Sequence, residues 1–132
     1  MLVSPTNFSG ILRFISRRFG DARGHFSESW NKRTLEEAGV FLPDFVQDNH
    51  SLSSQVGTMR GLYYEAPPYA QGKLVRCGRG RIFDVAVDAR MKSPTYGSWY
   101  GEELSFENGA QLWITAGVLH GFITLEPESE MI

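Results

Sequence analysis

The stretch Arg81-Ile-Phe-Asp-Val-Ala-Val-Asp88 decides the fold of this chain. Its β-branched residues and alternation are typical of a β-strand, in which successive side chains point to opposite faces. One face consists of Phe83, Val85 and Val87, and the other of Ile82, Asp84, Ala86 and Asp88. We expect the purely apolar face to be packed. The carboxylate face has two interpretations: it lines a ligand cavity inside a barrel, or it is a solvated outer surface.

Working outward, seven more short runs have strand character. They are residues 11–16, 44–47, 58–65, 73–77, 99–106, 111–115 and 119–125. Turn residues separate them at Gly78-Arg79-Gly80, Glu107-Asn108-Gly109 and Ala116-Gly117, which predicts that consecutive strands pair as antiparallel hairpins. Helical signals occur only from Asn31 to Gly39, with Ser29 or Asn31 as the cap. The sequence therefore predicts an all-β fold with one or two short helices.

Composition narrows the function classes. The chain has 132 residues, enough for one domain with a real core. Its formal net charge of -2 argues against a general binder of nucleic acid or of anionic membranes. The single cysteine, Cys77, allows no intrachain disulfide, and no apolar run is long enough to span a membrane. We expect a cytoplasmic protein without nucleic-acid or membrane partners, shortened at its C-terminus because it stops in the strand-like run that ends at Ile132.

Four polar segments could carry chemistry, because catalysis needs titratable or dipolar groups that converge on one pocket. They are Gly20–Glu28, Gln47–Ser51, Arg60–Glu65 with Gln71–Lys73, and Gly117–Phe122. Each segment also has a plainer interpretation. In the same order, these are a charged surface turn, an Asx-type turn, a strand whose lysine extends into water, and a histidine with a structural role. The three histidines have no neighbour at metal-ligand spacing, so we expect no metal.

Taken in order, these segments resemble one family. The matching blocks are Gly20-Asp-x-Arg-Gly-x-Phe-x-Glu28, Phe45-Val-Gln-Asp-Asn-His-Ser51, Arg60-Gly-Leu-x-Tyr64, Gln71-Gly-Lys-Leu-Val75, Phe83-Asp-Val-Ala-Val-Asp88, Ser93-Pro-Thr95 with Gly97, Gln111-Leu-Trp-Ile114 and His120-Gly-Phe122. This ordered set, from about Phe19 to the C-terminus, resembles the dTDP-4-dehydrorhamnose 3,5-epimerase family. The resemblance implies a metal-free double-stranded β-helix of the cupin type (a jelly roll), no cofactor, a homodimer and a dTDP-sugar ligand.

The resemblance also implies roles for individual residues. Arg23, Phe26 and Glu28 would reach the nucleotide in the partner subunit's site. Gln47, Asn49 and Arg60 would contact the diphosphate and the sugar. Lys73 would lie next to the C4 oxygen, with His120 and Asp84 in the same cavity, and we expect these three residues to be catalytic together with Tyr63. An epimerase needs a base, an acid and a cation at the enolate oxygen, and Lys73 fits the third role.

This chain departs from the family pattern at the base and at the acid. The family's histidine base is replaced by Tyr63, and Glu65 replaces a glutamine. The family's acid tyrosine would follow the strand that begins at Glu130-Met-Ile132. Three functions stay open: an epimerase that works through an enolate, at both carbons or at one only, with Tyr63 as proton donor or acceptor; an inactive nucleotide-sugar-binding paralogue; and a structural dimer partner.

Overall fold

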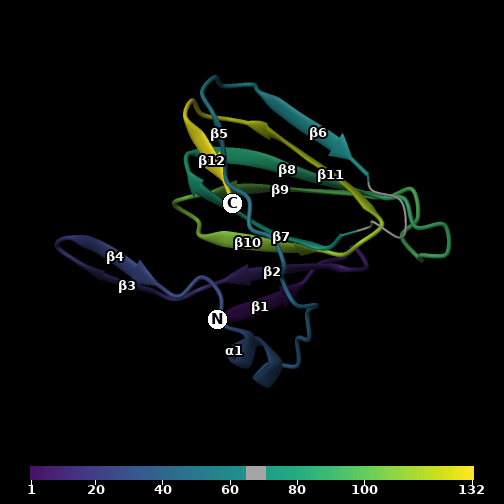
Figure 1. The fold of residues 1–132 in the computed structure, drawn as a ribbon, viewed down its shortest axis with the longest axis horizontal. Coiled ribbons are helices and arrows are strands. Elements are labelled where there is room, and N and C mark those ends of the chain that lie inside the picture. The colour runs from purple at the N-terminus through teal and green to yellow at the C-terminus, as the bar shows by residue number, and fades with distance from the viewer. Residues whose placement is uncertain (65–70) are drawn as a thin grey trace.

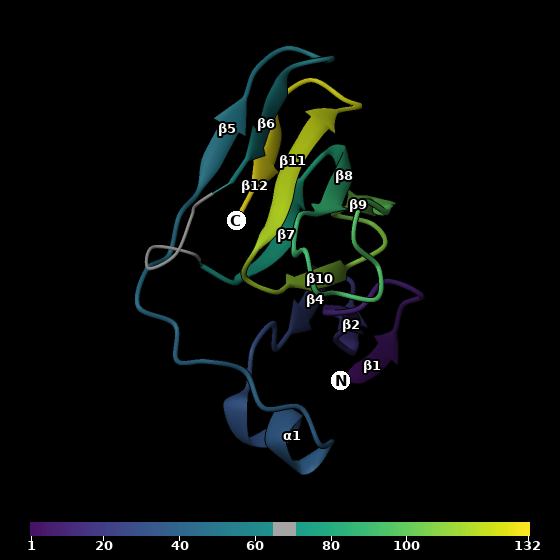
Figure 2. The same ribbon diagram turned by 90° about the vertical axis from the view of Figure 1, so that its right-hand side faces the viewer.

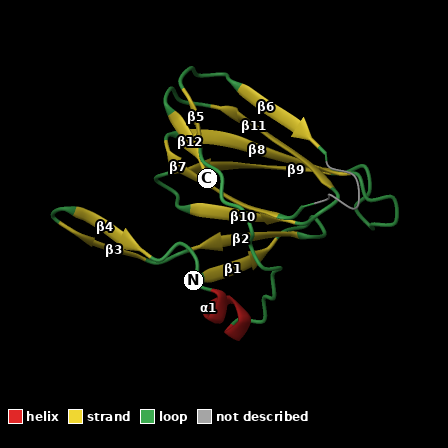
Figure 3. Cartoon of the chain, viewed as in Figure 1, coloured by secondary structure: helices red, strands yellow, loops and turns green. Residues whose placement is uncertain are grey.

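The computed structural model describes residues 1–64 and 71–132, which form two large β-sheets, one short helix and a two-stranded arm (Figures 1 and 3). The helix is α1 (Lys32–Glu37). The strands are β1 (Leu2–Pro5), β2 (Ile11–Ile15), β3 (Arg18–Asp21), β4 (Gly24–Ser27), β5 (Ser51–Ser53), β6 (Met59–Tyr63), β7 (Lys73–Arg79), β8 (Arg81–Asp88), β9 (Trp99–Ser105), β10 (Ala110–Ile114), β11 (Val118–Thr124) and β12 (Ser129–Met131). One sheet has the order β1-β2-β10-β7-β12-β5, and the other has the order β6-β11-β8-β9. The all-β prediction is confirmed.

Strand β8 has the predicted bounds and the predicted alternation, but it faces the opposite way from our expectation. The even-numbered side chains are the buried ones, and Asp84 and Asp88 are each only 1% exposed. Phe83, Val85 and Val87 lie on the outward face and stay partly exposed. The expectation that the purely apolar face is packed was therefore wrong, and so was the interpretation of the carboxylate face as a solvated surface. Inward carboxylates are tolerated because each has a polar partner, described below.

The connections between strands also differ from prediction. Gly80, the Glu107–Gly109 turn and the Ala116–Gly117 turn are turns as expected, with positive φ at Gly80 (80°), Gly109 (62°) and Gly117 (89°). None of them closes a hairpin, because each joins a strand of one large sheet to a strand of the other (Figure 2). A left-handed glycine satisfies a tight hairpin and a corner between sheets equally well, so the turn chemistry did not reveal the pairing. The chain thus crosses repeatedly between sheets, as a jelly roll does.

Other segments refine the sequence analysis. Residues 44–47 form no strand, and Asp44 instead makes a 2.9 Å ion pair with Lys32. The polar turn expected at 20–28 is the β3–β4 hairpin, and the polar run 47–51 leads into β5. Asn31 caps α1 by accepting a hydrogen bond from the Thr34 amide at 3.0 Å. The strand-like C-terminal run forms β12. Glu65 and the loop expected at 66–70 lie outside the described residues.

Two apolar cores hold the sheets and the helix in place. The larger core lies between the sheets and includes Ile11, Ile82, Leu104 and Leu112. The smaller core lies on the outer face of the six-stranded sheet, where Leu35 of α1 packs with Phe14 and Trp113. Figure 2 shows α1 below this sheet. Within the described ranges, no helix combines the length and the apolar character needed to cross a lipid bilayer.

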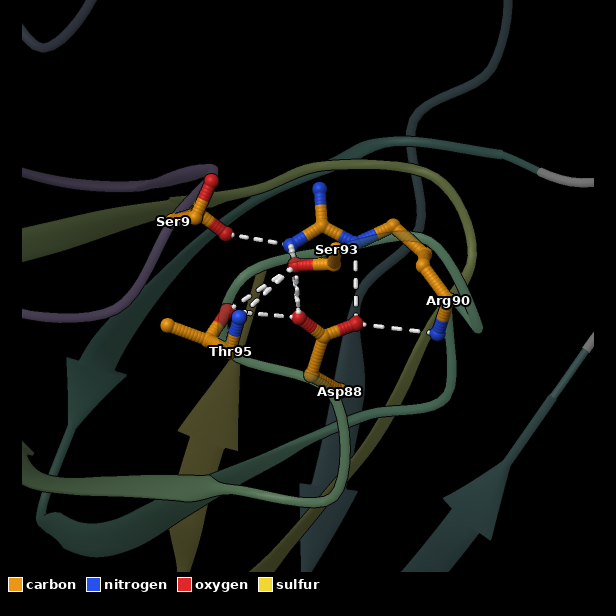
Figure 4. A network of polar contacts seen from close by, with 5 residues as sticks. All are labelled: Ser9, Asp88, Arg90, Ser93 and Thr95. Carbon is orange, nitrogen blue, oxygen red and sulfur yellow. Dashed lines mark hydrogen bonds and ion pairs between the residues drawn. The ribbon is translucent and has the colours of Figure 1, made fainter.

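Asp88 anchors the loop that follows β8 (Figure 4). Its carboxylate accepts hydrogen bonds from Arg90 Nε and Nη2, both at 2.9 Å, and from Ser93 Oγ and Thr95 Oγ1 at 2.5 and 2.6 Å. Arg90 also donates to the Ser9 carbonyl, which ties this loop to the β1–β2 connection. Burial acts to raise the pKa of Asp88, but the hydrogen bonds from Arg90, Ser93 and Thr95 outweigh it, so the pKa lies below its ordinary value.

We expect Asp88→Asn to lower the free energy of unfolding by about 3 kcal/mol, because it leaves the Arg90 cation without its counter-ion. Asp44→Asn, which breaks an exposed ion pair with Lys32, should cost about 0.5 kcal/mol or less. Urea denaturation of both variants at neutral pH measures the difference. The folded-state pKa of Asp88 is depressed, so its contribution is fully present above the pKa of an unfolded aspartate, about 4. It should disappear as pH falls below that value, and equal losses for both variants at neutral pH would contradict the assignment.

Candidate functional site

A cavity of about 620 Å³ is lined by residues of strands β6, β7 and β11 and of the segment 45–51. Strands β6, β7 and β11 each contribute a polar side chain to its wall, namely Tyr63, Lys73 and His120. These are three of the four residues predicted to be catalytic. His120 is directly opposite Tyr63 in the β6–β11 ladder, and Lys73 begins β7. Three groups from distant parts of the sequence therefore surround one space.

The fourth predicted residue, Asp84, lies behind His120. Its Oδ1 is 2.7 Å from His120 Nε2, and both side chains are buried. This contact leaves Nδ1 as the ring nitrogen that can exchange a proton with a ligand. Within the described residues, Asp84 Oδ2 has no hydrogen-bond partner. Burial raises the pKa of Asp84 above its ordinary value, although the hydrogen bond from His120 and the charge of Lys73 act in the opposite direction.

The polar run 47–51 also lines the cavity. Gln47 and Asn49 are both in the wall, and Gln47 Nε2 donates to Asn49 Oδ1 at 3.4 Å. His50, which the sequence analysis left as an isolated histidine, is also in the wall, and its Nε2 is 3.3 Å from Glu130 Oε1. The run is thus part of a site as well as a connection into β5.

Arg76 is a wall residue that the sequence analysis missed. It follows Lys73 by three positions on β7, so strand periodicity places the two side chains on opposite faces. The cavity includes residues from both faces of β7, among them Lys73 and Val75 on one face and Leu74 and Arg76 on the other. A second cation is therefore available to an anionic ligand. The signal in the sequence, a basic residue inside an apolar strand, was too common to single out.

Arg60 is not in the cavity wall as the structure describes it. Its Nε donates to Ser53 Oγ at 3.0 Å, and its Nη2 donates to the Leu52 carbonyl at 3.2 Å. Because β6 and β5 are edge strands of different sheets, Arg60 connects the two sheets at this side of the barrel. Its predicted contact with a diphosphate stays a prediction.

The remaining predicted binding residues are on the arm. Figure 1 shows β3 and β4 projecting away from both large sheets. Phe26 is 73% exposed, Glu28 is exposed, and Arg23 makes a 2.6 Å ion pair with Asp21 on the arm itself. None of the three lines the cavity of its own chain. Their predicted role in the site of a partner subunit is compatible with this position and stays a prediction.

The groups that can contact a ligand include the imidazole of His120, the ammonium of Lys73, the guanidinium of Arg76, the phenol of Tyr63 and the amides of Gln47 and Asn49. Among the residues that the structure describes, no three histidine, cysteine, aspartate or glutamate side chains come together as a metal-binding group. The arrangement can bind an anion through Lys73 and Arg76, and it can move a proton through Tyr63 or His120.

Comparison with known proteins gives a consistent result. Residues 5–132 match the model of a family described as dTDP-4-dehydrorhamnose 3,5-epimerase. A protein of that name from Sinorhizobium fredii is 56% identical over 117 residues, which cover 86% of this chain and 57% of the relative. One from Shigella flexneri is 52% identical over 132 residues, which cover all of this chain and 72% of the relative. The chain thus spans between about half and three quarters of the length of these relatives.

A solved structure also matches closely. The epimerase of the same name from Bacillus anthracis, crystallised with TDP and PPi bound, superposes with a TM-score of 0.94 at 46% identity. The match covers 98% of this chain and 74% of that chain. The cupin-like jelly roll expected from the sequence is therefore confirmed.

Replacing Arg60 tests its structural contact. Arg60→Met should lower the free energy of unfolding by about 1–2 kcal/mol, because it removes two hydrogen bonds and leaves the buried Ser53 hydroxyl without this donor. Arg76→Met is the matched control and should cost less than about 0.5 kcal/mol. Urea denaturation measures both values, and an equal cost for the two variants would contradict the contact.

Proposed function

Because this chain belongs to the dTDP-4-dehydrorhamnose 3,5-epimerase family, we propose that it epimerises a dTDP-linked 4-keto-6-deoxyhexose through an enolate, in the biosynthesis of a rhamnose-type deoxysugar. The observation that carries this proposal is the convergence of Tyr63, Lys73 and His120 on one cavity. The TDP bound to the Bacillus anthracis relative supports a nucleotide ligand of this class.

The chemistry needs three functions at the sugar. A hydrogen on the carbon next to the C4 ketone is acidic only because its removal gives an enolate. Lys73 supplies the positive charge that stabilises the enolate oxygen. Tyr63 and His120 are adjacent across the β6–β11 ladder, and they donate or accept the proton at the carbon. Asp84 is a positioning residue, since its contact with Nε2 fixes the ring of His120.

Other residues of the cavity bind the nucleotide sugar. Lys73 and Arg76 attract the diphosphate, and Gln47 and Asn49 donate hydrogen bonds to the phosphates or to the sugar. Arg23, Phe26 and Glu28 of one copy reach the nucleotide in the cavity of a second copy, where Phe26 offers an exposed ring for stacking. In this assignment, a homodimer completes each site.

A second candidate is a nucleotide-sugar-binding protein without turnover. The observation that favours it is Tyr63, because this position holds the histidine base in the family pattern. A phenol is almost fully protonated at neutral pH, so it abstracts a carbon-bound proton far less readily than an imidazole. The two candidates differ in proton exchange and agree in ligand binding.

Exchange of substrate hydrogen with solvent tests the proposal. We expect the protein to incorporate deuterium at C3 or C5 of a dTDP-4-keto-6-deoxyhexose in deuterated water, measured by NMR. Lys73→Met should slow incorporation by about 100-fold or more, because it removes the cation at the enolate oxygen. Lys92→Met, at an exposed loop position, should leave the rate unchanged. Binding of dTDP in calorimetry without any exchange would favour the second candidate, and absence of both would exclude the two.

A gain-of-function variant tests the role of position 63. Tyr63→His should raise the exchange rate by about tenfold or more, because an imidazole titrates near neutral pH and abstracts the proton more readily. Tyr64→His is the matched control, since Tyr64 is the next residue, is also about half exposed and is not in the cavity wall. The same NMR assay measures both variants. Equal rates for the two variants would mean that position 63 does not face the reacting carbon.

A further inference from the structure

The β3–β4 arm is fastened to the rest of the chain at the β9–β10 turn, residues 106–109. The two strands of the arm form a separate two-stranded sheet, so the orientation of the arm depends on other contacts. Arg18, the first residue of β3, makes two of them. Its Nη1 donates to the Glu107 carbonyl at 2.9 Å, and its Nη2 donates to the Phe106 carbonyl. One guanidinium thus holds two carbonyls of the β9–β10 turn, which the forked donors of arginine allow.

The ring of Phe106 adds two further contacts with the arm. Arg18 Cζ lies 5.2 Å from the centroid of this ring, within the range of a cation–π interaction. The ring of His25 on β4 lies 5.5 Å from it, measured between the centroids. A Cβ at Gly109 would lie 3.0 Å from Arg18 Nη2, so a glycine at this position leaves room for the guanidinium. Both strands of the arm therefore contact one turn, which fixes the orientation of the arm.

The pairing of β3 with β4 determines which side of the arm meets the turn. Along β3, the side chains of Arg18 and Phe19 point to opposite sides. Phe19 is opposite Phe26 in the ladder, so these two rings share a side. His25 lies on the other side with Arg18, toward the turn. The contact with the turn therefore leaves Phe26 on the free side of the arm, where it is 73% exposed.

We propose that Arg18 is a positioning residue, which holds the arm on the β9–β10 turn so that Phe26 is presented to the nucleotide. This inference rests on the proposed function, which assigns Arg23, Phe26 and Glu28 to the nucleotide. An arm without an anchor would lose conformational freedom when it meets a ligand, whereas an anchored arm has lost that freedom beforehand. The anchor thus strengthens binding of the nucleotide and leaves binding of the diphosphate in the cavity unchanged.

Titration calorimetry with dTDP and with inorganic pyrophosphate tests the proposal. Arg18→Met should raise the dissociation constant for dTDP about tenfold, because the released arm must be ordered on binding. The dissociation constant for pyrophosphate should not change, because pyrophosphate meets the cations of the cavity, Lys73 and Arg76. Arg33→Met is the matched control, since it removes an exposed arginine that pairs with Glu37 on its own helix. It should leave both dissociation constants unchanged.

A double-mutant cycle tests whether the two residues act through one anchor. Phe106→Ala keeps the backbone carbonyl and removes the ring, and it should also weaken binding of dTDP alone. The combined variant, Arg18→Met with Phe106→Ala, should weaken dTDP binding by less than the product of the two separate effects, because the second change acts on an arm that is already released. Independent, multiplicative effects would contradict a shared anchor.

Amide hydrogen exchange of the free chain, followed by mass spectrometry, observes the arm without a ligand. Peptides from residues 18–27 should exchange about fivefold faster or more in Arg18→Met, and at the wild-type rate in Arg33→Met. Unchanged exchange in Arg18→Met, unchanged dTDP binding, or an equal loss of dTDP and pyrophosphate binding would overturn the proposal and leave the proposed function standing. A wild-type chain that binds dTDP no more tightly than pyrophosphate would overturn both, because the arm then has no nucleotide to meet.

Discussion

Burial of two carboxylates on one strand is the constraint on which the rest of the structure depends. An unpaired buried carboxylate costs several kcal/mol, so β8 can point Asp84 and Asp88 inward only if each finds a partner. His120 on β11 meets Asp84, and Arg90, Ser93 and Thr95 on the following loop meet Asp88. The first contact fixes the register of β11 on β8 behind the cavity wall. The second fixes the loop at one end of the same strand.

The same orientation determines where the polar and apolar surfaces lie. With the aspartates inside, the barrel has a polar region in its interior, where Lys73 and Tyr63 join His120. The apolar residues of β8 must then point outward, beside Leu119, Gly121 and Ile123 of β11 and beside Trp99, Gly101 and Glu103 of β9. A cavity suited to a charged ligand and an apolar exterior are therefore two consequences of one strand.

Strand positions were largely predictable from this sequence, whereas their partners were not. The alternating residues of β8 predicted its bounds and the composition of its two faces. Alternation alone does not indicate which of the two faces points into the barrel. Gly80 and Gly109 marked turns, yet a positive φ serves a hairpin or a crossing between sheets alike. The β3–β4 arm was missed because Gly20, Asp21 and His25 have no apolar alternation, and its strands pair only with each other. Such a hairpin depends on its turn and not on burial.

The candidate site was predictable where it consists of short polar blocks and unpredictable where it depends on three-dimensional closure. The sequence blocks that resemble the family pattern include four residues that line the cavity: Gln47, Asn49, Lys73 and His120. Arg76 lines the cavity because the cavity contacts both faces of β7. The alternation of a strand does not predict such a contact. The guanidinium of Arg60 bonds to β5, a contact that its sequence block does not indicate, and its expected contact with the ligand stays a prediction. An arginine that joins two edge strands also shapes the space between them, so β6 and its Tyr63 depend on that contact for their position beside His120.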